Sequence, residues 1–129
     1  MNDTPLSILI LDDETPIRES FVDYFQDMGW QPIAATNAES AIDAIKRASP
    51  VAAVVDIRLS GMNGDAFIHK AHDIRPDLVF VICTGSPEYR IPRDLAALPQ
   101  VSKRVFIKPV IDLDALVAEI LKTIANNKK

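Results

Sequence analysis

Short apolar runs alternate along the chain with segments whose apolar residues recur at helical spacing. The third of these runs is apolar on both faces, which is typical of a parallel strand that helices cover on both sides. Strands that alternate with helices predict a doubly wound α/β sheet, because parallel strands need long crossover connections. The expected strands cover about residues 6–11, 32–35, 51–55, 78–83 and 104–107.

Five helices are expected between and after these strands. Thr15, Thr36 and Asp112 are the expected N-caps of the first, second and last helix, the second through the capping-box spacing Thr36–Glu39. The expected buried stripes include Met28 on the first helix and Leu121 on the last. The expected helices cover about residues 16–28, 37–48, 64–74, 93–98 and 113–124.

The length of 129 residues fits one domain, and no linker divides it. Right-handed crossovers leave few topologies for five parallel strands, and we expect the order 2-1-3-4-5 of the flavodoxin-like fold. Residues 1–129 are therefore interpreted as a single domain without a separate output domain.

Bulk properties exclude several classes of function. A net charge of −4 argues against direct nucleic-acid binding, which usually requires a basic surface. No apolar stretch reaches the roughly 20 residues that cross a bilayer, and the start of the chain does not resemble a secretory signal. The single cysteine, Cys83, cannot form an internal disulfide. We therefore expect a cytoplasmic protein that is not inserted in a membrane.

Polar side chains follow four of the apolar runs. Asp12 and Asp13 come after the first, Asp56 after the third, Thr84 after the fourth and Lys108 after the fifth. Ligands of open parallel sheets bind beyond the carboxyl ends of the strands, where the winding direction reverses. We expect these five side chains to meet there and to form a site for a divalent cation and a phosphoryl group.

The charges of this group indicate its chemistry. Three carboxylates and one ammonium sum to −2 if all are ionised, which a divalent cation would neutralise. Oxygen ligands favour Mg²⁺, with Mn²⁺ as an alternative. Mg²⁺ takes one or two carboxylates, which leaves one free as a nucleophile. Asp56 stands alone and is the natural acceptor, forming an acyl phosphate. Lys108 would neutralise charge on the phosphoryl oxygens.

The chain resembles the receiver domains of two-component response regulators over essentially its whole length. Each motif alone is weakly specific, but their order and spacing together are highly specific. The matching motifs are Ile8–Glu14, Val54–Gly64, Thr84-Gly85 and Lys108-Pro109.

The resemblance implies which of these residues would be phosphorylated and which would bind the metal. Asp56 would be phosphorylated by a sensor histidine kinase or a phosphotransfer protein. Asp13, Asp56 and the backbone carbonyl of Arg58 would bind Mg²⁺ directly, and Asp12 would act through a metal-bound water. The domain would catalyse only its own phosphorylation and dephosphorylation, so it is not expected to be an enzyme in the usual sense.

The resemblance also implies a switch. The Thr84 hydroxyl and the Lys108 ammonium would contact the phosphoryl oxygens, and Phe106 occupies the position of the family's switch aromatic. A movement of Thr84 and Phe106 on phosphorylation would alter a surface that binds a downstream effector protein. The resemblance also allows a homodimer. Ser60 stands where proline is common in the family, so we expect a less stiff loop. Three prolines interrupt residues 86–102, which match the family poorly.

Other functions remain open at this point. A degenerate receiver that binds proteins without being phosphorylated is the main alternative, although all five site positions are filled. A flavodoxin-like redox protein would need a phosphate-binding loop where this chain has Asp12, Asp13 and Glu14. A phosphatase of the haloacid-dehalogenase type would need an aspartate at position 58, which is arginine.

Overall fold

The computed structural model describes residues 5–59 and 61–128. Five parallel strands form one sheet in the order β2-β1-β3-β4-β5, so the expected doubly wound fold is confirmed. The strands are β1 Ser7–Leu11, β2 Gln31–Ala35, β3 Ala52–Asp56, β4 Val79–Thr84 and β5 Val101–Ile107. The helices are α1 Thr15–Asp27, α2 Ala38–Ala48, α3 Gly64–Ile74, α4 Arg93–Ala96 and α5 Leu113–Asn126.

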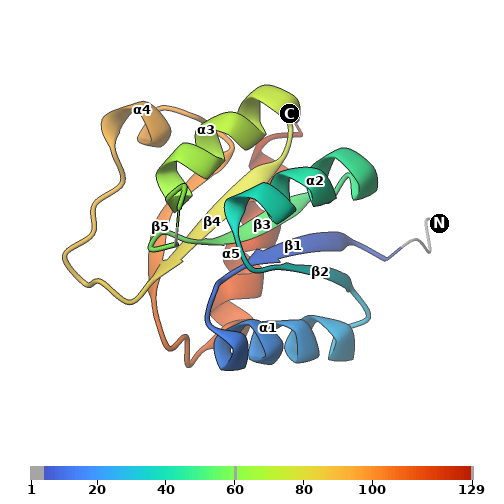
Figure 1. Cartoon of the computed structure of the whole chain (residues 1–129). Helices are drawn as coiled ribbons and strands as arrows, with labels where there is room; N and C mark the ends of the chain where they lie inside the picture. Colours follow the sequence, from blue (N-terminus) through green and yellow to red (C-terminus); the bar gives the residue numbers. More distant parts are fainter. Residues whose placement is uncertain (1–4, 60, 129) are drawn as a thin grey trace.

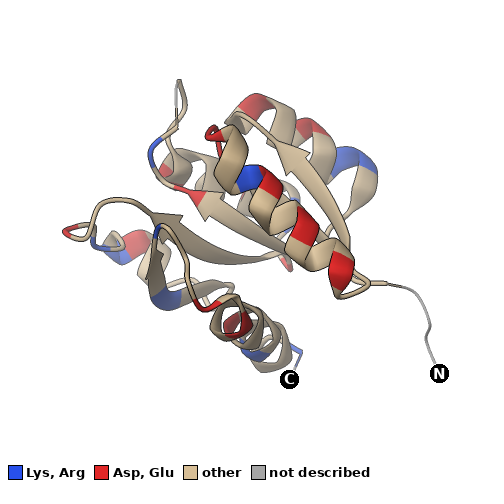
Figure 2. Ribbon diagram, turned by 90° about the horizontal axis from the view of Figure 1, so that it is seen from below, with Lys and Arg blue, Asp and Glu red and all other residues tan. Residues whose placement is uncertain are grey.

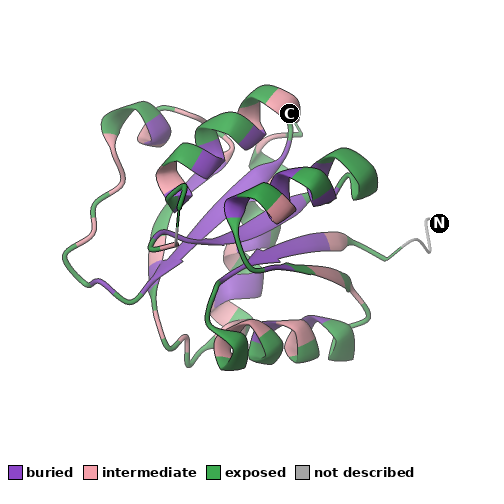
Figure 3. Ribbon diagram, viewed as in Figure 1, coloured by how far each residue is buried: buried purple, intermediate pink, exposed green. Residues whose placement is uncertain are grey.

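Helices cover both faces of the sheet (Figure 1). Alternate residues of β1 point to opposite faces, so Leu9 and Leu11 pack with α2 and α3, whereas Ile8 and Ile10 pack with α1 and α5. The central strands β3 and β4 are buried along their whole length (Figure 3). Burial on both faces explains why these strands are continuous apolar runs in the sequence.

Two of the three expected helix caps are wrong by one position. Glu14 precedes α1, so Thr15 is the first residue of the helix rather than its cap. Asn37 rather than Thr36 caps α2, and its side chain accepts a hydrogen bond from the Ser40 amide at 2.8 Å. The asparagine side-chain carbonyl satisfies the Ser40 amide, one residue beyond the Glu39 amide that a capping box starting at Thr36 would have used. Asp112 caps α5 as expected.

Two large residues of the expected apolar stripes are exposed. Met28 is 41% exposed, because it lies just beyond the last residue of α1, and Leu121 on α5 is 44% exposed. Acidic residues occur along the outer surface of α1 (Figure 2). Among the described residues, no helix is long and apolar enough to cross a membrane.

The region after β4 differs most from the expectation. β5 begins at Val101, three residues early, and contains a bulge, since Val101 pairs with Phe80 and Val105 with Ile82. The polar residues of the bulge hid the start of this strand. The helix α4 has four residues and ends two residues before the expected end. The expectation for Ser60 lies outside the described residues.

Candidate functional site

The five predicted site residues lie at the carboxyl edge of the sheet. Asp12 directly follows β1, Asp56 ends β3, Thr84 ends β4 and Lys108 follows β5. The parallel register aligns these strand ends, because Leu11 pairs with Val55, Asp56 with Cys83 and Thr84 with Ile107. The topology therefore brings together residues that are far apart in the chain.

Lys108 lies at the centre of the group. Its ammonium nitrogen is 3.1 Å from Asp12 Oδ2, 3.2 Å from Asp56 Oδ2 and 2.9 Å from Glu14 Oε1. The side chains of Lys108, Asp12 and Asp56 are 5%, 2% and 3% exposed, whereas that of Glu14 is 57% exposed. Three carboxylates thus surround one buried cation.

Four carboxylates converge at this edge. Oxygens of Asp12, Asp13, Glu14 and Asp56 lie within 4.8 Å of one another. Four negative charges and the Lys108 ammonium sum to −3 if all are ionised, which is unfavourable without a further cation. Carboxylate oxygens are the ligands that Mg²⁺ prefers, so this donor set fits such an ion. Glu14 was not predicted as a site residue, although its position directly after the acidic pair was a usable signal.

The pKa of Asp56 is raised above its ordinary value. Burial is the main cause, and the nearby Asp12 carboxylate adds to it. Lys108 and the Arg58 amide, which donates to Asp56 Oδ1 at 3.2 Å, act in the opposite direction. A cation at this position would favour the ionised carboxylate, which is the form that attacks phosphorus.

The pKa of Lys108 is also raised. Burial alone would lower it, but the hydrogen bonds to Glu14 and Asp12 and the charge of Asp56 outweigh that effect. Lys108 therefore stays an ammonium ion at neutral pH. A fixed positive charge beside Asp56 is suited to stabilising phosphoryl oxygens.

Thr84 and Arg58 meet at Ser86. The Thr84 hydroxyl is fully buried and accepts a hydrogen bond from the Ser86 amide at 3.2 Å. The Arg58 guanidinium donates to the Ser86 hydroxyl and lies 3.6 Å from Glu88. The side chain of Arg58 thus bridges the loop after β3 and the loop after β4. Metal binding by its backbone carbonyl stays a prediction.

Phe106 is buried in the core beneath the site. Its side chain is 6% exposed and packs in the cluster formed with α1 and α5. The Arg104 guanidinium carbon lies 4.6 Å from the centre of the Phe106 ring, a cation–π contact that covers it. The ring points inward in this structure, and its role as a switch stays a prediction.

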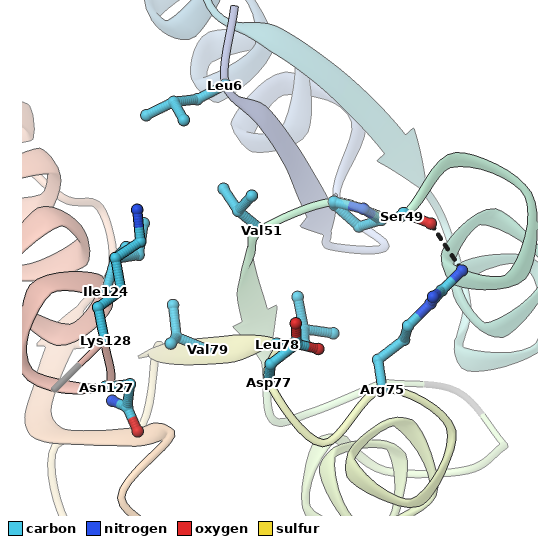
Figure 4. A pocket seen from close by; sticks show the side chains of 11 residues that line it. Leu6, Ser49, Val51, Arg75, Asp77, Leu78, Val79, Ile124, Asn127 and Lys128 are labelled. Atoms are coloured by element: carbon cyan, nitrogen blue, oxygen red, sulfur yellow. Dashed lines mark hydrogen bonds between the residues drawn. The ribbon is translucent and has the colours of Figure 1, made fainter. Parts of the chain in front are cut away.

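Two cavities lie at opposite edges of the sheet. A cavity of about 500 Å³ beside the acidic cluster is lined by Asp13, Ile57, Arg58, Leu59, Asn63 and Tyr89, and it provides access to the site. A cavity of about 230 Å³ lies where the strands begin (Figure 4), with an apolar floor that includes Val79 and Ile124. Arg75 donates to the Ser49 hydroxyl at 2.6 Å on its rim. Of the four clustered carboxylates, that of Asp13 lines the first cavity.

Fold and site together define a receiver-type module with an acidic site at the carboxyl edge of its sheet. The response regulator receiver domain family matches residues 8–121. The chain belongs to this family, whose members are the receiver modules of two-component signalling.

Curated relatives and solved structures agree with this family. Sporulation initiation phosphotransferase F of Bacillus subtilis is 27% identical over 108 residues, which cover 81% of this chain and 87% of that protein. The probable transcriptional regulatory protein TcrX of Mycobacterium tuberculosis is 31% identical over 63% of this chain. This chain spans only 35% of TcrX, so it corresponds to about a third of that relative.

Solved receiver structures have the same fold. A CheY-like receiver domain from Methanospirillum hungatei has a TM-score of 0.81 at 26% identity and covers 97% of this chain and 98% of its own. The response regulator TrrA of Thermotoga maritima, solved with Mg²⁺ and BeF, has a TM-score of 0.77 at 22% identity. The alignment with TrrA covers 92% of this chain and 98% of TrrA.

Proposed function

We propose that this chain accepts a phosphoryl group on Asp56 and passes a signal to a partner by changing its surface. A carboxylate oxygen of Asp56 would attack phosphorus and form an acyl phosphate, while the bond from phosphorus to the donor histidine nitrogen breaks. The released nitrogen keeps the electron pair and takes a proton. The observation that carries this proposal is the 3.2 Å contact between Lys108 and Asp56 within the acidic cluster.

Mg²⁺ is the proposed cofactor. Asp13, Asp56 and the backbone carbonyl of Arg58 would hold the ion, and Asp12 would act through a bound water. When bound, Mg²⁺ offsets negative charge on the phosphoryl oxygens. Mg²⁺ rather than Mn²⁺ is proposed, because the related TrrA structure was solved with Mg²⁺.

The protein's own groups would orient and stabilise the phosphoryl group. The Lys108 ammonium would leave part of its carboxylate contacts and bind a phosphoryl oxygen. The Thr84 hydroxyl, which now accepts the Ser86 amide, would donate its proton to another oxygen. The movement of Thr84 is the proposed start of the surface change.

The proposed phosphodonor is a sensor histidine kinase or a phosphotransfer protein, and the proposed target is a downstream effector protein. Ile111 supports a protein donor, because it is 92% exposed three residues beyond Lys108. An apolar side chain so exposed beside the site suits contact with a partner. A single receiver domain over residues 1–129, a cytoplasmic location and a homodimer stay predictions.

Incubation with Mg²⁺ and acetyl phosphate, followed by intact-mass spectrometry, tests this function. We expect a mass gain of one phosphoryl group in the wild type and none in Asp56→Asn. Asp73→Asn, an exposed α3 variant of the same chemistry, should be phosphorylated like the wild type. A folded wild type that gains no mass with acetyl phosphate or phosphoramidate would overturn the proposal and favour the degenerate receiver.

A further inference from the structure

Three side-chain links fasten the segment after β4 to the side of the molecule that carries α3. Arg58 binds Ser86 and Glu88 at the start of this segment. The other two links start from α3, which lies beside α4 in Figure 1. They are the hydrogen bond from the Tyr89 hydroxyl to Asp65 Oδ1 at 2.6 Å and the contact of His69 Nε2 with Asp94 Oδ2 at 2.8 Å.

The two α3 residues in these links lie on one face of the helix. Asp65 and His69 are four residues apart, which places them on the same side of α3, about one helical turn from each other. Their partners Tyr89 and Asp94 lie before and inside the four-residue helix α4. One end of this face is therefore linked to the segment before α4 and the other end to α4 itself.

A continuous path of hydrogen bonds joins this contact to the acceptor site. The Ser86 amide donates to the Thr84 hydroxyl at 3.2 Å, and the Tyr89 amide donates to the Ser86 carbonyl at 3.1 Å. The Tyr89 hydroxyl then reaches Asp65 in the first turn of α3. If Thr84 turns its hydroxyl toward a phosphoryl group, the Ser86 amide loses its acceptor and this path must change.

We propose that Tyr89 and Asp65 form a latch that carries a movement of Thr84 to α3, so that phosphorylation of Asp56 alters the α3–α4 surface. This inference rests on the proposed function. The tyrosine–carboxylate bond has a charged acceptor and is therefore stronger than an ordinary hydrogen bond. The raised pKa of Tyr89, caused by burial and by Asp65, agrees with a hydroxyl that stays protonated in this bond.

Hydrogen–deuterium exchange with and without Mg²⁺ and beryllofluoride, a stand-in for the phosphoryl group, tests the latch. In the wild type we expect beryllofluoride to change the exchange of α3 amides. In Tyr89→Phe and Asp65→Asn this change should be lost, and α3 of the free proteins should exchange about three- to tenfold faster, as expected for one lost hydrogen bond. Phosphorylation by acetyl phosphate should persist in both variants.

Tyr24→Phe is a matched control. The Tyr24 hydroxyl also donates to a carboxylate, that of Asp114 on α5, but it lies on the opposite face of the sheet. This variant should keep the wild-type response of α3. The latch is overturned if Tyr89→Phe also keeps that response, or if wild-type α3 does not respond although the protein is phosphorylated. A wild type that is neither phosphorylated nor bound by beryllofluoride instead overturns the proposed function, and the latch with it.

Discussion

The Lys108 ammonium lies 3.2 Å from the carboxylate of Asp56, although α3, β4, α4 and β5 lie between the two residues in the chain. Both side chains are at most 5% exposed. A cation held this close to a buried nucleophile favours its ionised form, in opposition to the burial that raises the pKa of Asp56, and prepares a position for phosphoryl oxygens. The relationship also makes the two residues depend on each other for stability.

Replacement of Lys108 by alanine should destabilise the metal-free protein without unfolding it. The loss leaves the buried carboxylates of Asp12 and Asp56 without their cation, at a cost of about 1–3 kcal/mol. Mg²⁺ should raise the melting temperature more in Lys108→Ala than in the wild type, because no ammonium competes with the ion. Thermal unfolding over a Mg²⁺ titration measures both effects, with the exposed Lys46→Ala as control.

Lys108→Ala should also separate phosphorylation from its response. The variant should still be phosphorylated on Asp56 by acetyl phosphate but should lose the beryllofluoride-induced change in hydrogen exchange. An unchanged exchange response in this variant would count against the role assigned to Lys108.

Asp13→Asn should weaken the stabilisation by Mg²⁺. The substitution removes one negative charge from an exposed member of the four-carboxylate cluster while keeping its shape. At Mg²⁺ concentrations far above the dissociation constant, a tenfold loss of affinity lowers the stabilisation by about 1.4 kcal/mol. Asp73→Asn, outside the cluster, should leave the Mg²⁺ dependence of the melting temperature unchanged. Equal curves for both variants would exclude Asp13 as a ligand.

Gly64→Ala should disturb the acceptor strand. An added Cβ would lie 2.5 Å from the Asp56 carbonyl oxygen and 2.7 Å from the Ile57 Cα, so backbone must move. Such overpacking costs about 1–3 kcal/mol, more than the helix propensity that alanine contributes. Urea unfolding should show this loss, and phosphorylation by acetyl phosphate should slow. Among the described residues nothing lies within 4 Å of a Cβ added at Gly85, so Gly85→Ala should change the unfolding free energy by less than about 0.5 kcal/mol.

The contribution of Tyr89 to stability should disappear at alkaline pH. Its pKa is raised in the folded protein, so the protonated hydroxyl stabilises the fold fully below the ordinary pKa of about 10 and progressively less above it. The difference in unfolding free energy between wild type and Tyr89→Phe should therefore shrink as the pH rises past about 10. Urea unfolding in mildly alkaline and strongly alkaline buffer measures it. A difference that stays constant with pH would contradict the partly buried Tyr89–Asp65 bond.

Local patterns in the sequence were sufficient for most elements. The continuous apolar runs before Asp56 and Thr84 predicted buried parallel strands, because only a strand covered on both faces excludes polar residues entirely. The start of β5 was missed, since the polar residues Ser102 and Lys103 interrupt the apolar pattern after Val101. The Thr36 cap was wrong because two neighbouring residues could each cap α2, and only the backbone geometry selects Asn37.

The sequence by itself determined the fold class and placed Asp12, Asp13, Asp56 and Lys108 at one edge of the sheet, because the ends of the parallel strands follow from the alternation of apolar runs with helices. Only the tertiary structure placed Glu14 on Lys108, turned Phe106 inward beneath Arg104 and joined Tyr89 to Asp65. These contacts depend on side-chain directions and loop paths between elements that are distant in the chain. No local pattern of residues contains that information.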